Sequence, residues 1–134
     1  MDIKLIIPQR EPMIMIDDII SHTETETVTS FQIMQNNIFV ENNIFQSSGL
    51  IENIAQSSAA RMGMQTIKNR KEPLLGYIAS IKNMNIKYLP KVGETIQTEI
   101  IISNEINNII VVQGKSKVGN NLISNCELKV FIEI

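Results

Sequence analysis

The sequence predicts an α+β fold in which a curved antiparallel sheet of about six strands wraps around one long central helix. Two observations predict it. Much of the chain alternates apolar and polar side chains in short runs separated by turn residues, as half-buried strands do. One segment, 48–67, instead repeats its apolar side chains with the period of a helix, and it is too apolar to stay uncovered. The 134 residues contain no linker, so we expect a single domain over 1–134.

The predicted order is strand, strand, helix and four strands. Turn residues such as Gly119-Asn120-Asn121 separate the strands, and the last four strands are expected to form an antiparallel meander. The helix is expected over Ser48–Ile67, with an apolar stripe made of Leu50, Ile51, Ile54, Ala55, Ser58, Ala59 and Met62. The predicted strands are Met13–Ser21, Thr25–Met34, Leu74–Tyr88, Thr95–Ile102, Ile109–Lys117 and Leu122–Ile134.

Composition excludes several functions. Hydrophobic residues make up 43% of the chain, and 12 basic residues against 14 acidic ones give a formal net charge of −2. A nucleic-acid-binding surface normally needs a basic surplus, so no nucleic acid is expected. No apolar run is long enough for a membrane span. Cys126 is the only cysteine, which favours a reducing, cytoplasmic setting, and the sequence has no His/Cys cluster for a metal.

Four segments, in order, carry a family resemblance. They are the opening Ile7–Asp17 (IPQREPMIMID), the helix segment Gly49–Gln56 with its acid one turn before a glutamine, the strand segment Leu75–Ile81 and the turn Pro90–Ile96 (PKVGETI). In these motifs the chain resembles the 3-hydroxyacyl-[acyl-carrier-protein] dehydratases of the hot-dog fold. The resemblance runs from about Ile6 to Ile134.

The chain also departs from that family. The family carries its catalytic histidine in a Gly-His-Phe-Pro loop before the helix, whereas Ile38–Phe45 contains no histidine, and Gln9 replaces the histidine of the opening loop. In this respect the chain is similar to a divergent branch associated with aryl-polyene and flexirubin-type pigments. The one histidine, His22, is expected in an exposed turn.

The resemblance implies a site at the start of the helix. Glu52 would be the acid and Gln56 would hold its carboxylate, while Glu41 is a candidate substitute for the missing base. Both acids have plainer interpretations, Glu52 as a first-turn carboxylate that stabilises the helix dipole and Glu41 as an exposed loop acid. The substrate-binding candidates are the Gly49 and Leu50 amides, which would polarise the thioester oxygen, together with Pro8, Phe39 and Phe45.

The implied function is that of a dehydratase-like protein that binds acyl thioesters, with dehydration of a 3-hydroxyacyl chain as the leading activity. The substrate would carry its own 4′-phosphopantetheine on acyl carrier protein or coenzyme A, and no other cofactor is expected. Two alternatives remain: an acyl thioesterase that uses Glu52, and a non-catalytic partner of an active dehydratase. Because a curved sheet leaves an open edge, we expect a homodimer or higher oligomer, or pairing with a paralogous subunit that supplies the base.

Overall fold

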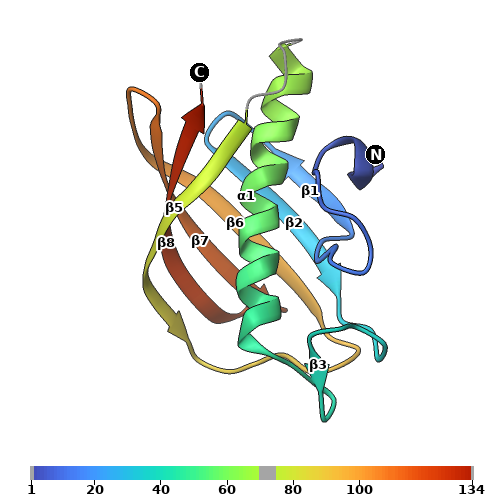
Figure 1. Ribbon diagram of the computed structural model, residues 1–134. Helices are drawn as coiled ribbons and strands as arrows, with labels where there is room; N and C mark the ends of the chain where they lie inside the picture. The colour runs from blue at the N-terminus through green and yellow to red at the C-terminus, as the bar shows by residue number, and fades with distance from the viewer. Residues whose placement is uncertain (1, 70–74, 134) are drawn as a thin grey trace.

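The computed structural model describes residues 2–69 and 75–133, in which a six-stranded antiparallel sheet surrounds a long helix (Figure 1). The spatial order of the strands is β1-β2-β6-β7-β8-β5. This architecture confirms the predicted fold class. The strands of the sheet are β1 (Asp18–His22), β2 (Glu26–Gln32), β5 (Leu75–Ile86), β6 (Thr95–Ile106), β7 (Ile109–Val118) and β8 (Asn121–Glu133).

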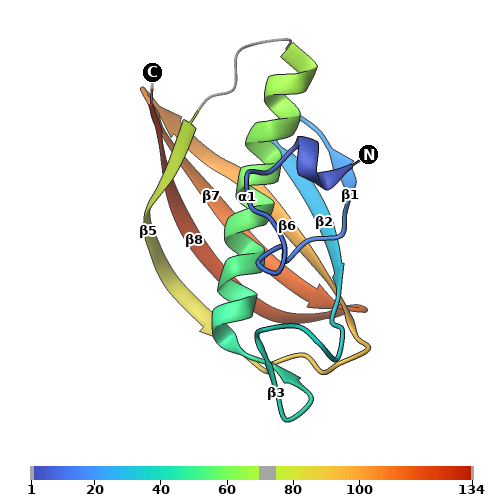
Figure 2. The same cartoon turned by 45° about the vertical axis from the view of Figure 1, so that its right-hand side comes forward.

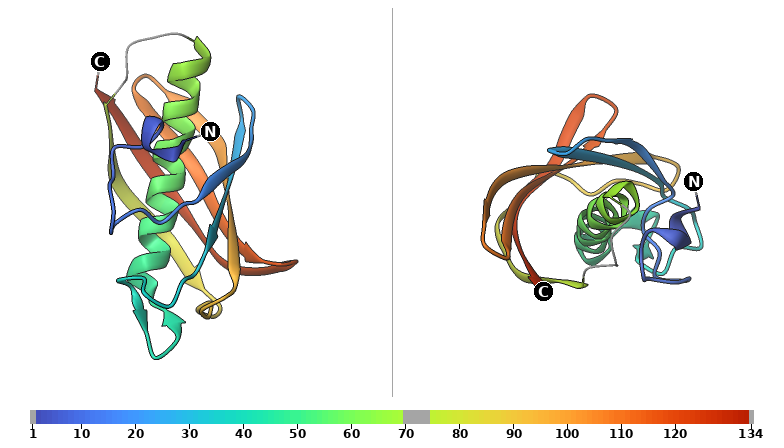
Figure 3. Two further views of the ribbon diagram at one scale, coloured as in Figure 1. Left: turned by 90° about the vertical axis from the view of Figure 1, so that its right-hand side faces the viewer. Right: turned by 90° about the horizontal axis from the view of Figure 1, so that it is seen from above.

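The helix α1 spans Ser47–Asn69 and lies in the concave face of the sheet. Seen from above in Figure 3, the strands curve around it on one side and leave its other side open. The core between helix and sheet is mostly aliphatic, with Leu50 and Ile54 of α1 against Ile100 of β6 and Leu128 of β8. Burial of these side chains is the main force that bends the sheet around the helix.

The predicted four-strand meander is wrong in one respect. β6, β7 and β8 do pair in sequence order, but β5 pairs with β8 at the edge of the sheet and not with β6. Both sides of β6 are already occupied, by β2 and by β7. The chain therefore crosses from β5 to the far side of the sheet between Ile86 and Thr95 (Figure 2). Leu74, the first residue of the predicted strand, lies outside the described residues.

The buried face of α1 is rotated relative to the predicted stripe. Leu50, Ile54 and Ser58 are buried as expected, whereas the other members, Ile51, Ala55, Ala59 and Met62, are only partly covered. Polar side chains take their place beneath the helix. The sheet supplies hydrogen-bond partners to two of them, Thr98 to Asn53 and Thr29 to Ser57. The buried polar or charged residues of α1 are Asn53, Gln56, Ser57, Ser58 and Arg61.

Two further segments frame the start and the open side of α1. A two-stranded hairpin, β3 (Val40–Glu41) and β4 (Ile44–Phe45), which the sequence did not predict, leads directly into the helix. The N-terminal segment begins with a 3-10 turn, η1 (Ile3–Leu5), and its Ile6 and Ile7 pack near Ala60 on the side of β1. Across residues 2–69 and 75–133, no helix has the length and apolarity needed to span a membrane.

Candidate active site

Glu52 and Gln56 lie one turn apart on α1 and are joined directly. Gln56 Nε2 donates a 2.9 Å hydrogen bond to Glu52 Oε1, as the sequence predicts. Glu52 is partly exposed, whereas Gln56 is completely buried. One face of the carboxylate is thus fixed by the protein while the rest remains open to a ligand.

Gln56 is also the anchor for the segment that crosses the helix before β1. Its Nε2 donates to the carbonyl oxygen of Met13 at 2.7 Å, and its Oε1 accepts from the N–H of Met15 at 2.7 Å. The side chain therefore satisfies main-chain groups on both sides while it holds Glu52. Such a fully used, buried amide has little freedom to rotate, which fixes the position of the Glu52 carboxylate.

A second buried amide, Asn53, continues this polar network into the sheet. Asn53 Nδ2 donates to the carbonyl oxygen of Met15 at 2.7 Å, and its Oδ1 accepts from the Thr98 hydroxyl at 2.6 Å. The Thr98 hydroxyl lies 3.2 Å from that of Ser116 on β7. Sequence reasoning missed Asn53 and Thr98. The available signal was that Asn53 falls between Leu50 and Ile54 on the helix face that packs on the sheet.

The start of α1 offers free amides, but at other residues than the sequence suggests. The N–H groups of Gly49 and Leu50, expected to polarise a thioester oxygen, both donate to the carbonyl of Gln46, at 3.0 and 3.1 Å. Within the described chain, the N–H groups of Ser47 and Ser48 have no protein acceptor. These two amides at the positive end of the helix are therefore the ones available to an oxyanion.

Gly49, Phe39 and Phe45 lie together, where they pack as part of the core. A Cβ atom added at Gly49 would lie 2.6 Å from both Phe39 Cβ and the Phe45 ring. Phe45 is fully buried, and its ring meets that of Phe39 edge to face at 6.5 Å. The glycine lets the helix approach the hairpin closely, so that both aromatic rings lie beside the first turn of α1.

Neither Glu41 nor His22 is brought into contact with Glu52. Glu41 is exposed on the β3–β4 hairpin, and its side chain makes no hydrogen bond or ion pair with the described residues. His22 was expected in an exposed turn, which is wrong: it ends β1 half-buried, with Nδ1 2.7 Å from Thr27 Oγ1 and Nε2 2.9 Å from Gln65 Oε1. At ~1.5 Å of rise per residue, Gln65 lies about 20 Å along the helix from Glu52.

An apolar groove of about 590 Å³ runs along the open side of α1. Ala55 and Ala59 of the helix line it, and both share a helix face with Glu52. The opposite wall is formed by the edge strand β5, with Tyr77 and Ile78, and the far rim by the opening loop, with Pro8. Glu52 lies one turn before the groove begins and is not part of its lining.

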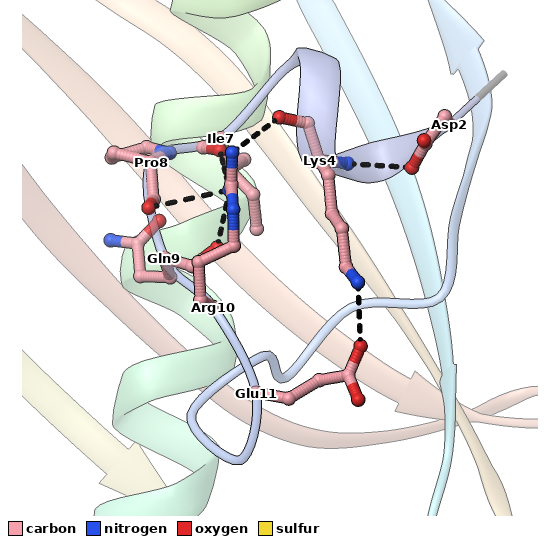
Figure 4. A network of polar contacts seen from close by, with 7 residues as sticks. All are labelled: Asp2, Lys4, Ile7, Pro8, Gln9, Arg10 and Glu11. Atoms are coloured by element: carbon pink, nitrogen blue, oxygen red, sulfur yellow. Dashed lines mark hydrogen bonds and ion pairs between the residues drawn. The ribbon is translucent and has the colours of Figure 1, made fainter.

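The opening loop that carries Pro8 is held by Arg10 (Figure 4). The Arg10 guanidinium donates to the carbonyl oxygens of Ile7 at 3.0 Å, of Gln9 at 2.8 Å and of Lys4 at 3.1 Å. Lys4 also pairs with Glu11 at 2.9 Å, and this hydrogen-bonded ammonium lowers the pKa of Glu11 below its usual range. These contacts hold the loop together within the N-terminal segment, whose Pro8 and Gln9 line the groove.

This arrangement supplies part of the chemistry of dehydration. Removal of water from a β-hydroxyacyl thioester needs a base for the α-proton, an acid for the departing hydroxyl and donors for the thioester oxygen. The described residues offer a partly exposed carboxylate, Glu52, and two amides without a protein acceptor, those of Ser47 and Ser48. Among the described residues, no second ionisable side chain forms a hydrogen bond or ion pair with Glu52, and no group of three or more His, Cys, Asp or Glu would hold a metal.

Sheet, helix and acid together define a hot-dog protein, in which a long helix with a carboxylate in its second turn lies inside one curved antiparallel sheet. Comparison with known families then gives the family itself. The chain belongs to the ApeP-like dehydratases, whose family model matches residues 1–133. The resemblance to a divergent dehydratase branch, seen in the sequence motifs, is confirmed.

Relatives at lower similarity agree. The chain is 29% identical to the 3-hydroxyacyl-[acyl-carrier-protein] dehydratase FabZ of Bacillus velezensis over 132 residues, which cover 94% of this chain and 92% of the relative. It is 27% identical to FabZ of Caldanaerobacter subterraneus over 134 residues, covering 95% and 92%. These relatives match the chain over almost its whole length.

Solved structures share the fold. The dehydratase heterocomplex ApeI:P from Xenorhabdus doucetiae contains a chain that superposes with a TM-score of 0.90 at 11% identity, over 100% of this chain and 92% of that one. A hypothetical thioesterase with coenzyme A from Streptococcus pneumoniae superposes with a TM-score of 0.72 at 10% identity, over 87% and 84%. At such identities the superpositions establish the shared hot-dog fold.

Proposed function

We propose that this chain binds 3-hydroxyacyl thioesters and takes part in their dehydration within a paired assembly, in which a second hot-dog subunit supplies the base. The observation that carries the proposal is the Glu52 carboxylate, held by the buried Gln56 and partly open, on the helix face that continues into the apolar groove. Glu52 would donate the proton that leaves with the hydroxyl. The Ser47 and Ser48 amides would stabilise the charge on the thioester oxygen.

The lining of the groove suits an acyl chain and the pantetheine arm that delivers it. Its walls are mainly small or aliphatic side chains, which suits a hydrocarbon. Gln9, on the rim, has a buried Oε1 without a hydrogen-bond donor among the described residues. That oxygen can accept an N–H of the pantetheine amides. Acyl carrier protein is the favoured carrier, by analogy with the FabZ relatives, and polyene chains are the favoured class, by resemblance to the pigment-associated branch.

The missing base supports pairing. Dehydration breaks an α-C–H bond and a β-C–O bond, so a group other than the proton-donating Glu52 must lie within reach of the α-proton. His22 is too distant, and Glu41 is exposed on the hairpin. The open side of α1 and the exposed apolar residues of the edge strand β5, Tyr77 and Ile78, leave a surface for a second subunit. The ApeI:P structure, which contains a chain of the same fold, is a dehydratase heterocomplex, and this supports pairing with a second subunit.

The test is to purify the full chain alone and together with a histidine-bearing hot-dog paralogue of the same organism. Each sample is incubated with a 3-hydroxyacyl-carrier protein, and the product is weighed by mass spectrometry. Loss of one water that requires both subunits and is abolished by Glu52→Gln supports the proposal. Glu41→Gln is the matched control and should leave the reaction intact.

Other outcomes separate the alternatives. Loss of the acyl group would establish a thioesterase, and unchanged turnover in Glu52→Gln would remove Glu52 from the mechanism. If the paralogue alone dehydrates the substrate as well as the pair does, this chain is a non-catalytic partner. Water loss by this chain alone, as a homodimer, would overturn the part of the proposal that assigns the base to another subunit.

A further inference from the structure

Arg61 is a charged residue on the buried face of α1. Only 5% of its surface is exposed. Its Nε has no hydrogen-bond acceptor within the described residues, and its guanidinium forms no ion pair with any of their carboxylates. Burial lowers the pKa of Arg61, while the charge of Glu105 on β6 acts in the opposite direction. An arginine remains charged even so, and a buried charge is strongly unfavourable without an anionic partner.

The guanidinium borders a cavity of about 550 Å³ at the end of the sheet where α1 emerges. Its aliphatic lining comes from three adjacent strands, with Ile102 of β6, Ile110 of β7 and Ile132 of β8, and polar side chains of α1 and of the β1–β2 turn complete the wall. Glu24 and Glu105, both exposed, stand at its polar margin. A volume of this size is typical of small-molecule sites.

This cavity is separate from the groove that leads from Glu52. Arg61 lines the cavity and not the groove, and the two spaces lie on different sides of the helix. Met62 and Thr66 border both and form the partition between them. A ligand at Arg61 would therefore leave the acyl groove free.

We infer that the cavity is a second binding site, which takes an organic monocarboxylate with an aliphatic body and pairs its carboxylate with Arg61. The aliphatic walls match a hydrocarbon body, and the planar guanidinium matches a carboxylate through two parallel hydrogen bonds. The single buried cation, the Arg61 guanidinium, balances the single negative charge of a monocarboxylate. The carboxylates of Glu24 and Glu105 repel a second one, so multiply charged phosphates are excluded.

The test uses octanoate as the probe and 1-octanol as its uncharged counterpart, titrated calorimetrically into the purified full chain. Octanoate should bind saturably and at least about tenfold more tightly than octanol. The Arg61→Met variant should have an affinity for octanoate that is lower by a similar factor. Arg61→Lys keeps the charge and should retain part of the affinity, which keeps the test valid if Arg61→Met does not fold. Inorganic phosphate should not compete.

Two variants locate the ligand. Ala55→Phe obstructs the groove but lies outside the cavity, so octanoate binding should persist. Glu105→Gln removes a repelling carboxylate and should increase the affinity for octanoate. The inference is overturned if octanoate does not bind or binds no better than octanol, if Arg61→Met binds it normally, or if Ala55→Phe abolishes binding. It is also overturned if Glu105→Gln weakens binding, because the bound carboxylate would then not lie where the charge of Glu105 repels it.

Discussion

The hydroxyl of Thr98 donates a 2.6 Å hydrogen bond to Asn53 Oδ1 and so joins the first half of β6 to the first half of α1. Asn53 in turn donates to the carbonyl of Met15 at 2.7 Å, and all three residues are fully buried. One amide therefore ties together the helix, the sheet and the segment before β1. Because Asn53 follows Glu52 directly, this junction fixes the helical turn on which the acid lies.

Replacement of Asn53 by alanine should destabilise the protein by about 2–3 kcal/mol, because the buried Met15 carbonyl loses this partner and the buried Thr98 hydroxyl keeps only Ser116. Thr98→Val, which keeps the shape and removes the hydroxyl, should cost about 1–2 kcal/mol. Urea denaturation followed by circular dichroism measures both. The double variant should cost less than the two single changes added together, because they remove the same hydrogen bond. Strict additivity would show that the two side chains act independently.

Gln56→Leu should affect both stability and turnover. It removes one hydrogen bond to Glu52 and two main-chain bonds, so we expect a loss of about 2–3 kcal/mol in the free energy of unfolding. At a temperature where the variant is still folded, turnover at saturating substrate in the paired assembly should fall as well. Gln97→Leu, at an exposed position on β6, is the control and should change neither. Normal turnover per folded molecule would limit Gln56 to a role in the fold.

Gly49→Ala should be destabilising even though alanine favours helices by ~1 kcal/mol. The new methyl group would lie 2.6 Å from Phe39 Cβ and from the Phe45 ring, so the helix or the hairpin must move. Overpacking of this kind costs about 1–3 kcal/mol, and we expect a net loss seen as a lower midpoint of thermal unfolding. In a Phe45→Leu background, which makes room, the same substitution should cost less. An equal or larger cost there would show that Phe45 is not the obstacle.

The thiol of Cys126 should react slowly in the native protein. Burial raises its pKa, and although a backbone hydrogen bond involving Gly114 acts in the opposite direction, burial is the larger effect. Less thiolate is therefore present near neutral pH. In addition, only 4% of the surface of Cys126 is exposed to a reagent. Titration with a disulfide reagent at pH 8 should proceed at least about tenfold faster in denaturant than in buffer. Equal rates would mean that this part of β8 opens readily.

Much of the fold could be predicted because its signals are local. Alternation of apolar and polar side chains located the strands β6, β7 and β8, and the helical period located α1 to within two residues at each end. The predicted hydrogen bond from Gln56 to Glu52 is also local, since residues one turn apart on a helix are neighbours in any fold. The catalytic roles given to Glu52, Gln56 and Glu41 remain predictions.

Other features depended on distant partners. Asn53 and Arg61 were not singled out, because a polar residue on a helix is normally expected to face solvent. His22 was expected in an exposed turn, but its partners Thr27 and Gln65 come from the neighbouring strand and from the helix. The amides of Gly49 and Leu50 were expected to be free, and only the helix start fixed by the β3–β4 hairpin shows that they donate to Gln46.

By itself, the sequence determined the type of each main element, the central place of the helix and the position of Glu52 on it, because periodicity and turn residues act over a few residues. The tertiary structure decided that β5 lies beside β8, which face of α1 is buried and which amides at its start are free. Those outcomes depend on contacts between segments far apart in the chain. Such contacts are selected by the burial of apolar surface and the pairing of buried polar groups across the whole domain.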